Sequence, residues 1–340
     1  MRKLRVLALV HKELVPPADA TADAAKNADW KTEFDVLSSL SQLGHDVQPL
    51  GVGDDLRVMR TAIEEWKPQI AFNLLEHFHG IPTFDQNFVS YLELLRMPYT
   101  GCNPRGLLLA HDKALSKKLL SYHRIPAPDF VVFQIGRTVR RPKRLTFPLI
   151  VKSVTDEASI GISQASVVND DAKLAERVQF VHDANRTDAI VERYIDGREL
   201  YVSILGNQRL EVFPVWELFF RKMPPEAWHI ATDRLKWSGT YQKAHGIETD
   251  AASDLPEALV ERIQHLCRRV YRTLSLSGYA RIDLRLDREG GVYVLEANPN
   301  PQLACGEDFA ESAKRAGIPY GELLQRIINF GVLWRPERVP

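Results

Sequence analysis

The chain has 340 residues, enough for two or three compact lobes that each bury a core. Lys plus Arg and Asp plus Glu both number 44, so the zero net charge creates no global field that attracts nucleic acid or an anionic membrane. The three cysteines lack C-x-x-C spacing and no apolar stretch reaches transmembrane length, so we expect a cytoplasmic protein without disulfides, zinc, nucleic-acid or membrane partners.

The N-terminal part alternates between strand and helix patterns. Residues 4–10 form an apolar run of strand length, as in a parallel strand covered on both faces. Apolar residues then recur at helical spacing over 34–43, and strand patterns follow at 46–52 and 70–75. This rhythm predicts a doubly wound parallel-sheet lobe over residues 1–108.

Two further lobes are predicted in the rest of the chain. A small central lobe over residues 109–194 and a β-rich lobe over 195–340 follow from the change of pattern. The central lobe is expected to contain helices 114–122 and 171–182 and strands 147–152 and 189–194. The last lobe is expected to contain strands 199–205, 210–216, 279–286 and 291–297, with helices at 257–274 and within 308–331.

Polar side chains recur at every second position in two of these strands. Arg281 and Asp283 share one face of the first strand, and Glu296 and Asn298 share one face of the second. The short turn at 287–291 predicts an antiparallel hairpin, so the four side chains are expected to converge. Two carboxylates and an amide oxygen suit Mg²⁺, and an adjacent arginine binds phosphate oxygens. The alternative is a surface hairpin with alternating charges.

This hairpin resembles the magnesium motif of the ATP-grasp superfamily, most closely the D-alanine–D-alanine ligase-like branch. Further segments carry the resemblance in the expected order: Pro-Tyr-Thr-Gly at 98–101, Asp-Lys at 112–113, the strand 148–152, Val-Glu-Arg-Tyr-Ile-Asp-Gly-Arg-Glu at 191–199, Leu-Glu-Ala-Asn at 295–298, and the helical segment 311–324. The resemblance implies an α/β (α+β) ATP-grasp fold with three lobes and ATP between the last two. It also implies an ATP-dependent carboxylate–amine ligase that forms an acyl-phosphate and releases ADP and phosphate.

Cofactors and nucleotide contacts follow from the same resemblance. ATP and two Mg²⁺ ions are expected, with Mn²⁺ as a substitute, in a homodimer that acts on small amino-acid-like molecules. Lys113 and Lys152 match the lysines that hold the ATP phosphates. Without the resemblance, either lysine would be interpreted as a solvated surface charge. Glu192 and Glu199 match the acidic residues that contact adenine and ribose, and Ile195 matches the apolar residue that packs on the adenine.

Catalytic residues and lids are also implied. Asp283, Glu296 and Asn298 match the metal ligands, and Arg281 matches the arginine that stabilises the tetrahedral oxyanion. The segment 155–162, with Ser159, matches the flexible loop that covers the phosphates. Lys236 aligns with a basic residue near the transferred phosphate, and it reads equally well as an ordinary loop lysine. Segments 155–162 and 219–247 are the expected lids.

The substrate loops depart from the family. Its glycine- and serine-rich start, with a glutamate for the first substrate's ammonium, is replaced by a longer loop, and Glu13 or Glu33 is the candidate substitute. Where the family binds the second substrate's carboxylate, this chain has Glu307 and Asp308. These acids repel a carboxylate and suit a cationic amine, or else they cap the following helix. We therefore expect substrates other than two D-alanines.

The carboxyl edge of the first sheet supplies further candidates, because open α/β sheets bind ligands there. Glu76 and Asp85 are expected to contact a substrate, whereas His77 and His79 fit a pocket or structural role better than a metal site.

Two other functions remain open at this stage. One is a true D-alanine–D-alanine ligase with altered substrate loops. The other is a nucleotide-binding regulator without turnover, against which the complete set of metal and arginine residues argues.

Overall fold

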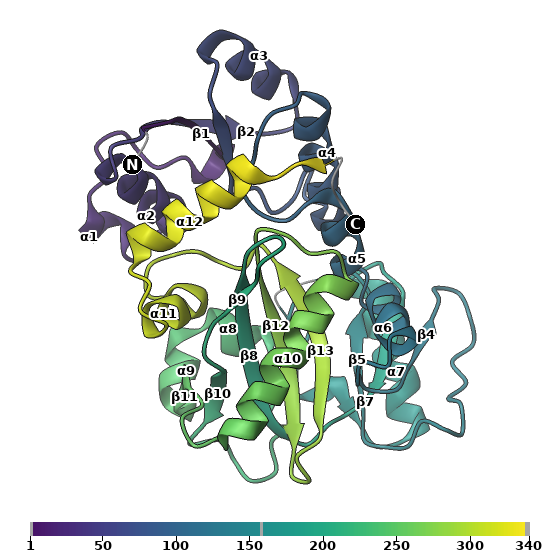
Figure 1. The fold of residues 1–340 in the computed structure, drawn as a ribbon. Coiled ribbons are helices and arrows are strands. Elements are labelled where there is room, and N and C mark those ends of the chain that lie inside the picture. Colours follow the sequence, from purple (N-terminus) through teal and green to yellow (C-terminus); the bar gives the residue numbers. More distant parts are fainter. Residues whose placement is uncertain (1–2, 157–158, 337–340) are drawn as a thin grey trace.

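A computed structural model describes residues 3–156 and 159–336, apart from the side chains of residues 236 and 237. The N-terminal part, purple and blue in Figure 1, contains a parallel sheet in the order β2-β1-β3. Its strands are β1 (Arg5–His11), β2 (Asp46–Val52) and β3 (Ile70–Asn73). Its helices are α1 (Ala22–Ala25), α2 (Lys31–Gln42), α3 (Arg57–Trp66) and α4 (Asp85–Leu94), with short 3-10 turns η1 (Lys12–Leu14) and η2 (Pro82–Phe84).

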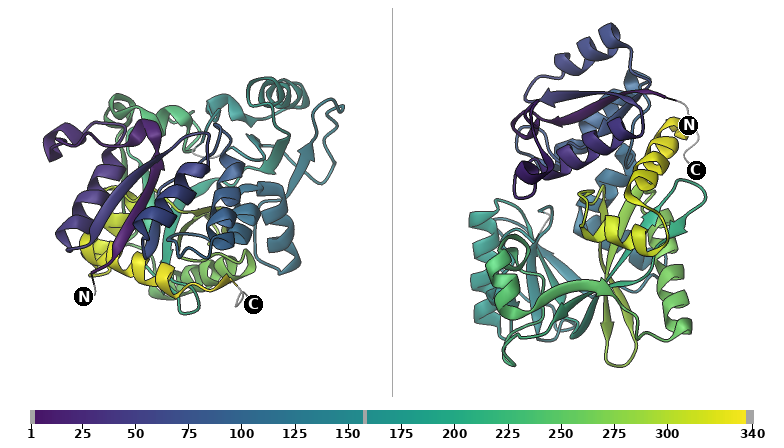
Figure 2. Two further views of the ribbon diagram at one scale, coloured as in Figure 1. Left: turned by 90° about the horizontal axis from the view of Figure 1, so that it is seen from above. Right: turned by 90° about the vertical axis from the view of Figure 1, so that its left-hand side faces the viewer.

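Burial explains the apolar run of the first strand. Residues 6–10 are completely shielded from solvent, because helices cover both faces of the sheet. The views in Figure 2 show this layered arrangement. The predicted parallel sheet of the N-terminal part is confirmed.

The central part contains an antiparallel sheet in the order β4-β7-β5-β6. Its strands are β4 (Phe130–Phe133), β5 (Leu149–Ser153), β6 (Val167–Val168) and β7 (Ala189–Arg193). Its helices are α5 (Pro104–His111), α6 (Lys113–Tyr122) and α7 (Asp171–Ala184), with a 3-10 turn η3 (Gln164–Ser166). Asp112 begins α6 by accepting hydrogen bonds from the backbone N–H groups of Ala114 and Leu115 at 2.9 and 2.8 Å.

The C-terminal part is built on a six-stranded antiparallel sheet in the order β11-β10-β8-β12-β13, with β9 paired to β8. Its strands are β8 (Gly197–Leu205), β9 (Glu211–Val212), β10 (Trp216–Phe220), β11 (Ile247–Ala251), β12 (Tyr279–Asp287) and β13 (Val292–Pro299). Its helices are α8 (Asp233–Trp237), α9 (Gly239–His245), α10 (Glu257–Thr273), α11 (Asp308–Arg315) and α12 (Tyr320–Leu333). The predicted strand at 210–216 is wrong, because Pro214 has no N–H for a ladder and the chain forms the separate strands β9 and β10 instead.

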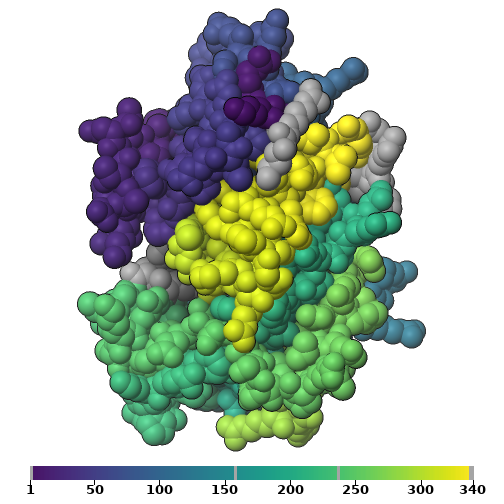
Figure 3. Space-filling model, turned by 60° about the vertical axis from the view of Figure 1, so that its left-hand side comes forward, coloured from purple at the N-terminus to yellow at the C-terminus, as the bar shows by residue number. Residues whose placement is uncertain are grey.

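The last helix packs against the first lobe. Ile327 and Ile328 of α12 are completely buried in one cluster with Val36, Leu40 and Phe72 of the N-terminal part. Figure 3 shows the yellow C-terminal segment in contact with both the purple and the green parts of the molecule. The end of the chain therefore joins the two large lobes.

One predicted lobe boundary lies within a helix and the other lies between two strands. The boundary at 108/109 lies inside α5, whereas the one at 194/195 lies between β7 and β8. The division into 1–108, 109–194 and 195–340 stays a prediction. The α/β class with parallel and antiparallel sheets is as expected. In the part of the chain that the structure describes, no helix combines the length and the apolar character needed to span a bilayer.

Candidate active site

The hairpin of β12 and β13 has the register that the sequence predicted. Arg281 lies directly opposite Asn298, and Asp283 lies directly opposite Glu296. Opposed residues in an antiparallel pair project to the same face, so the four side chains do converge. The register shifts after Asp283, and this bulge increases the local twist where the two carboxylates meet.

Arg281 is fixed beside one of the two carboxylates. Its Nε and Nη2 atoms donate to the two oxygens of Asp283 at 2.8 and 2.9 Å, and its guanidinium lies 4.5 Å from the centre of the Tyr201 ring. Burial lowers the pKa of Arg281, but the Asp283 carboxylate outweighs burial and raises it. The arginine therefore stays cationic in a position next to the expected metal ligands.

A cleft of about 790 Å³ lies between the central and C-terminal sheets. Eight of the residues predicted to bind nucleotide or metal line it: Lys113, Lys152, Ser159, Glu192, Ile195, Glu199, Asp283 and Glu296. They come from α6, β5, β7, β8, β12 and β13, from the loop after β5 and from the residues between β7 and β8, so segments far apart in the sequence form one site.

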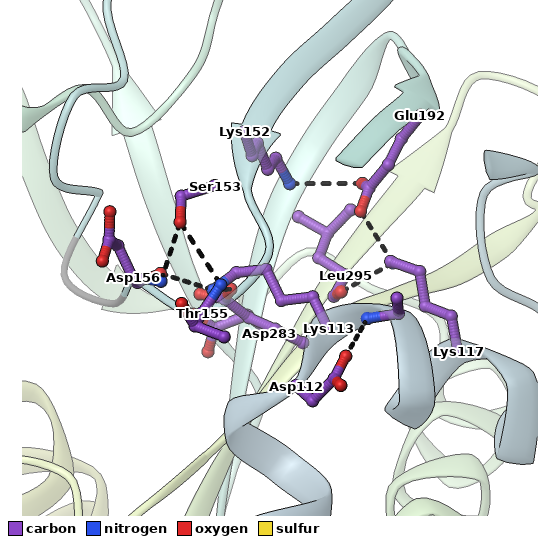
Figure 4. A network of polar contacts seen from close by, with 12 residues as sticks. Asp112, Lys113, Lys117, Lys152, Ser153, Thr155, Asp156, Glu192, Asp283 and Leu295 are labelled. Carbon is purple, nitrogen blue, oxygen red and sulfur yellow. Dashed lines mark hydrogen bonds and ion pairs between the residues drawn. The ribbon is translucent and has the colours of Figure 1, made fainter. Parts of the chain in front are cut away.

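Glu192 is completely buried between two lysines, as Figure 4 shows. Its Oε2 lies 3.3 Å from Lys152 Nζ, and its Oε1 lies 3.3 Å from Lys117 Nζ. Burial raises the pKa of Glu192, but Lys117 and Lys152 outweigh burial and lower it. Lys117 also donates to the carbonyl of Leu295 at 2.8 Å, next to Glu296. The sequence reasoning missed Lys117, although it follows Lys113 by four residues and so shares its helix face.

Lys113 connects the loop after β5 with the hairpin of β12 and β13. Its ammonium donates to the backbone carbonyl of Asp156 at 2.5 Å and lies 3.6 Å from Glu296 Oε2. The side chain is 8% exposed, so this cation is held within the cleft rather than in solvent. A single lysine thus stands between the loop and the expected metal ligands.

Glu199 is held by residues that the sequence reasoning did not select. Arg285 Nη2 donates to its Oε2 at 2.7 Å, and the Tyr201 hydroxyl donates to its Oε1 at 2.9 Å. Arg285 follows Arg281 and Asp283 on the same face of β12, and this alternation of charged residues is the signal that could have found it.

The two expected lids contact each other beside the cleft. The N–H of Asp233 donates to the carbonyl of Ile162 at 3.0 Å, and Gln164, two residues beyond the first lid, exchanges two hydrogen bonds with the backbone of Trp228, at 2.9 and 2.7 Å. Ser159 lines the cleft in a left-handed conformation, with φ +61°. Lys236 belongs to α8, and its side chain lies outside what the structure describes.

The three predicted substrate residues do not line the cleft. Asp85 is buried, with its Oδ2 3.0 Å from His111 Nε2, so it joins α4 to α5. Glu307 immediately precedes α11, and partial burial and the neighbouring Asp308 raise its pKa. Asp308 accepts a 2.6 Å hydrogen bond from Thr249 and lies 3.9 Å from Arg281.

Glu76 belongs to a cluster at the carboxyl ends of β1 and β3. The His11 and His77 rings stack 3.9 Å apart, and the Glu76 N–H donates to His11 Nε2 at 3.3 Å. Glu33, in the first turn of α2, is 4% exposed, and its Oε2 has no hydrogen-bond partner among the described residues. Burial and the Glu76 carboxylate raise the pKa of Glu33 to about 7. Burial and His77 lower the pKa of His11 to about 4.

The donor set fits Mg²⁺ that is shared with phosphate. Among residues 3–156 and 159–336, no three His, Cys, Asp or Glu side chains form a cage that would hold a metal alone. Mg²⁺ usually takes one or two carboxylates and completes its octahedron with water and substrate phosphates. The opposed carboxylates of Asp283 and Glu296 match that requirement, and Asn298 adds an amide oxygen two residues further along β13.

Comparisons with known proteins agree with this geometry. The family described as "D-ala D-ala ligase C-terminus" matches residues 119–329. An uncharacterized protein, y4sG, of Sinorhizobium fredii is 31% identical over 302 residues, which cover 86% of this chain and 85% of that protein. A D-alanine–D-alanine ligase of Pelotomaculum thermopropionicum is 27% identical, with 90% and 93% of the two chains covered.

Solved structures share the fold over almost the whole chain. The D-alanine–D-alanine ligase of Bacillus anthracis complexed with ATP has a TM-score of 0.74 at 23% identity, covering 97% of this chain and 98% of that one. The VanG D-Ala:D-Ser ligase of Enterococcus faecalis has a TM-score of 0.69 at 18% identity, covering 97% and 100%. The chain therefore belongs to the D-alanine–D-alanine ligase-like family of ATP-grasp ligases.

Proposed function

We propose that this chain joins a carboxylate to an amine at the expense of ATP, through an acyl-phosphate. The observation that carries the proposal is the pairing of Asp283 with Glu296 in the cleft that Lys113 and Lys152 also line. Opposed carboxylates for Mg²⁺ and lysines for phosphates are what phosphoryl transfer requires, because catalysis there is mostly positioning and charge neutralisation.

Each residue has a physical role in this proposal. Lys113 and Lys152 hold the phosphates, and Glu192 keeps Lys152 in place. Asp283, Glu296 and Asn298 would hold Mg²⁺, and the ion would neutralise phosphate charge when bound. Two ions, replaceable by Mn²⁺, complete this part of the proposal.

Ile195 and Glu199 receive the adenine and ribose. Arg281 stabilises the oxyanion that forms when the amine attacks, and Lys236 approaches the transferred phosphate. The lids, which Ile162 and Asp233 join, exclude water, so that the acyl-phosphate reaches the amine before it hydrolyses.

The acid substrate is proposed to carry an ammonium group that Glu33 and Glu76 bind. Glu33 lies in the first turn of α2, follows the long loop that replaces the family's glycine-rich start, and has a buried oxygen without a hydrogen-bond partner among the described residues. Since a buried unpaired carboxylate is unfavourable, a bound cation would stabilise it. Asp85 is left out of this set because His111 already occupies it.

The amine is proposed to be small and cationic, without a free carboxylate near Glu307. Glu307 and Asp308 place two acids beside Arg281, which is already bound to Asp283. A carboxylate placed there would face net repulsion. This argues against two D-alanines as substrates, the reaction in the names of several relatives.

The setting of the enzyme completes the proposal. We propose a cytoplasmic homodimer that binds neither membranes nor nucleic acid. The described cysteines are unpaired, as suits a reducing compartment.

The test is release of ADP by the purified protein with ATP and Mg²⁺, against a panel of amino acids and small carboxylic acids with and without amines. Hydroxylamine should trap the acyl-phosphate as a hydroxamate when the correct acid is present. D-alanine alone should release little phosphate, and robust dipeptide formation would make this a true D-alanine–D-alanine ligase. ATP binding without turnover for any pair would instead leave a nucleotide-binding regulator.

A further inference from the structure

Arg285 joins three separate parts of the nucleotide cleft. The residue is 3% exposed, and its Nη1 donates to the carbonyl of Gly197 at 2.9 Å. Its Nη2 donates to Glu199 Oε2 at 2.7 Å and also to the carbonyl of His229. Gly197 begins β8, Glu199 faces the cleft from the same strand, and His229 lies in the lid segment between β10 and α8. The guanidinium of Arg285 therefore holds the start of β8, the carboxylate of Glu199 and the lid segment at His229.

The carboxylate of Glu199 is oriented on both oxygens. Arg285 holds Oε2, and the Tyr201 hydroxyl holds Oε1 at 2.9 Å. A carboxylate has about four acceptor positions, so each oxygen keeps one for a ligand. Two acceptors at fixed spacing on the wall of the cleft suit two adjacent hydroxyl groups, as on a ribose.

Arg285 also contacts the lid segment, through the carbonyl of His229. His229 is followed by Ile230, which is buried in one cluster with Ile150 and Tyr194 on the opposite wall. The Arg285 guanidinium lies 5.7 Å from the centre of the Tyr194 ring. The residue that orients Glu199 therefore also holds the segment that closes the cleft.

We propose that Arg285 is a positioning residue that sets ribose specificity. Because it fixes Glu199, both carboxylate oxygens are positioned to accept hydrogen bonds from the 2′- and 3′-hydroxyls of the ribose. The protein therefore prefers ATP over 2′-deoxy-ATP. By fixing the carbonyl of His229, it keeps the lid closed over the nucleotide. The inference rests on the nucleotide site of the proposed function and adds a selectivity to it.

The experiment measures binding by calorimetry with Mg²⁺ and either ATP or 2′-deoxy-ATP. The wild-type protein should bind ATP about tenfold or more tightly than 2′-deoxy-ATP, the usual effect of one hydrogen bond to a charged group. Arg285→Met should reduce this preference to within about twofold, mainly by weakening ATP binding. Arg285→Lys should restore part of it, and Arg272→Met, at an exposed arginine of α10, should leave it intact.

Proteolysis gives an independent measure of the lid. With ATP bound, trypsin should cut after Arg221 or Lys222 faster in Arg285→Met than in the wild type, because the nearby lid has lost an anchor. Equal cutting rates would overturn the lid part of the inference.

The outcomes separate this inference from the proposed function. If the wild-type protein binds no nucleotide, the proposed function itself fails. If it binds ATP selectively and Arg285→Met keeps the same selectivity, only the role of Arg285 is refuted. Should Arg285→Met fail to fold, Tyr201→Phe decides, because it keeps the ring and removes only the hydroxyl on Glu199; an unchanged preference would overturn the inference.

Discussion

Replacing Glu33 with glutamine is expected to stabilise the fold at pH 8 and to weaken binding of the acid substrate. Burial and the Glu76 carboxylate raise the pKa of Glu33 from its ordinary 4.5 to about 7. Below about pH 4.5 the carboxyl is protonated in both the folded and the unfolded chain, and stability is fully present. As the pH rises through about 7, the folded protein must ionise this buried group, and that stability is lost.

The magnitude follows from the shift. One unit of pKa shift corresponds to about 1.36 kcal/mol, so ionising Glu33 costs the wild-type fold about 3 kcal/mol at pH 8. Glutamine keeps the size of the side chain and cannot ionise. The free energy of unfolding of Glu33→Gln should therefore exceed that of the wild type by up to about 3 kcal/mol at pH 8 and by little at pH 4.

The assay is urea unfolding of both proteins at several pH values, with the difference between them as the observable. The difference between the two proteins is needed because His11 also makes the stability depend on pH. Its folded pKa is lowered from 6.5 to about 4, so its stabilising contribution is present above pH 6.5 and lost as the pH falls toward 4. Since both proteins carry His11, subtraction removes its opposite slope.

A matched control and a functional readout complete this test. Glu65→Gln, at an exposed position of α3, should leave the pH dependence unchanged. In a turnover assay, Glu33→Gln should raise the KM for the acid substrate. A variant no more stable than the wild type at pH 8, or one equally stabilised at pH 4, would refute the electrostatic reasoning.

Three further substitutions test other parts of the structure. Glu296→Gln should abolish ADP release while the thermal midpoint of unfolding stays within about 2 °C, because it removes a charge at a partly exposed site. Glu192→Gln leaves two buried lysines without their carboxylate and should lower the free energy of unfolding by about 3–5 kcal/mol, measured with denaturant. Gly331→Ala places a Cβ 2.3 Å from the carbonyl of Tyr99 and should cost about 1–3 kcal/mol in the same measurement, since α12 must shift on the N-terminal sheet.

The hairpin of β12 and β13 was predictable because its determinants are local. Alternation on two strands separated by a short turn fixes which side chains share a face, and that fixes the meeting of Asp283 and Glu296. The first strand was predictable for a similar reason, since an unbroken apolar run is typical of a strand covered on both faces.

Contacts between distant segments were not predictable in the same way. Asp85 was selected from its position along the chain, and sequence spacing does not show that it meets His111, which lies on another helix. Lys117 and Arg285 carry charges that pattern alone assigns to solvent, yet tertiary packing buries both against carboxylates. The sequence pattern shows on which face of a helix or strand a residue lies, whereas the residue that it contacts depends on the tertiary fold.

The contact between Lys113 and Glu296 predicts that nucleotide binding and metal binding are coupled in the proposed site. Their charged atoms lie 3.6 Å apart. The ammonium of Lys113 therefore competes with the metal for Glu296, and the carboxylate of Glu296 competes with the phosphates for Lys113. When phosphates attract the lysine and the metal attracts the glutamate, each ligand removes the competitor of the other. Such coupling between sites typically amounts to about 1–3 kcal/mol, or roughly 5- to 150-fold in affinity.

Lys113→Met separates the two effects, because it removes the cation that competes for Glu296. Mn²⁺ alone, followed by electron paramagnetic resonance, should bind this variant several times more tightly than the wild type, while ATP should bind more weakly. Lys118→Met, at an exposed position of the same helix, should alter neither affinity. Unchanged or weaker Mn²⁺ binding to Lys113→Met would show that the lysine does not compete with the metal. The two ligands would then bind independently, and the arrangement of charges in the cleft would need another explanation.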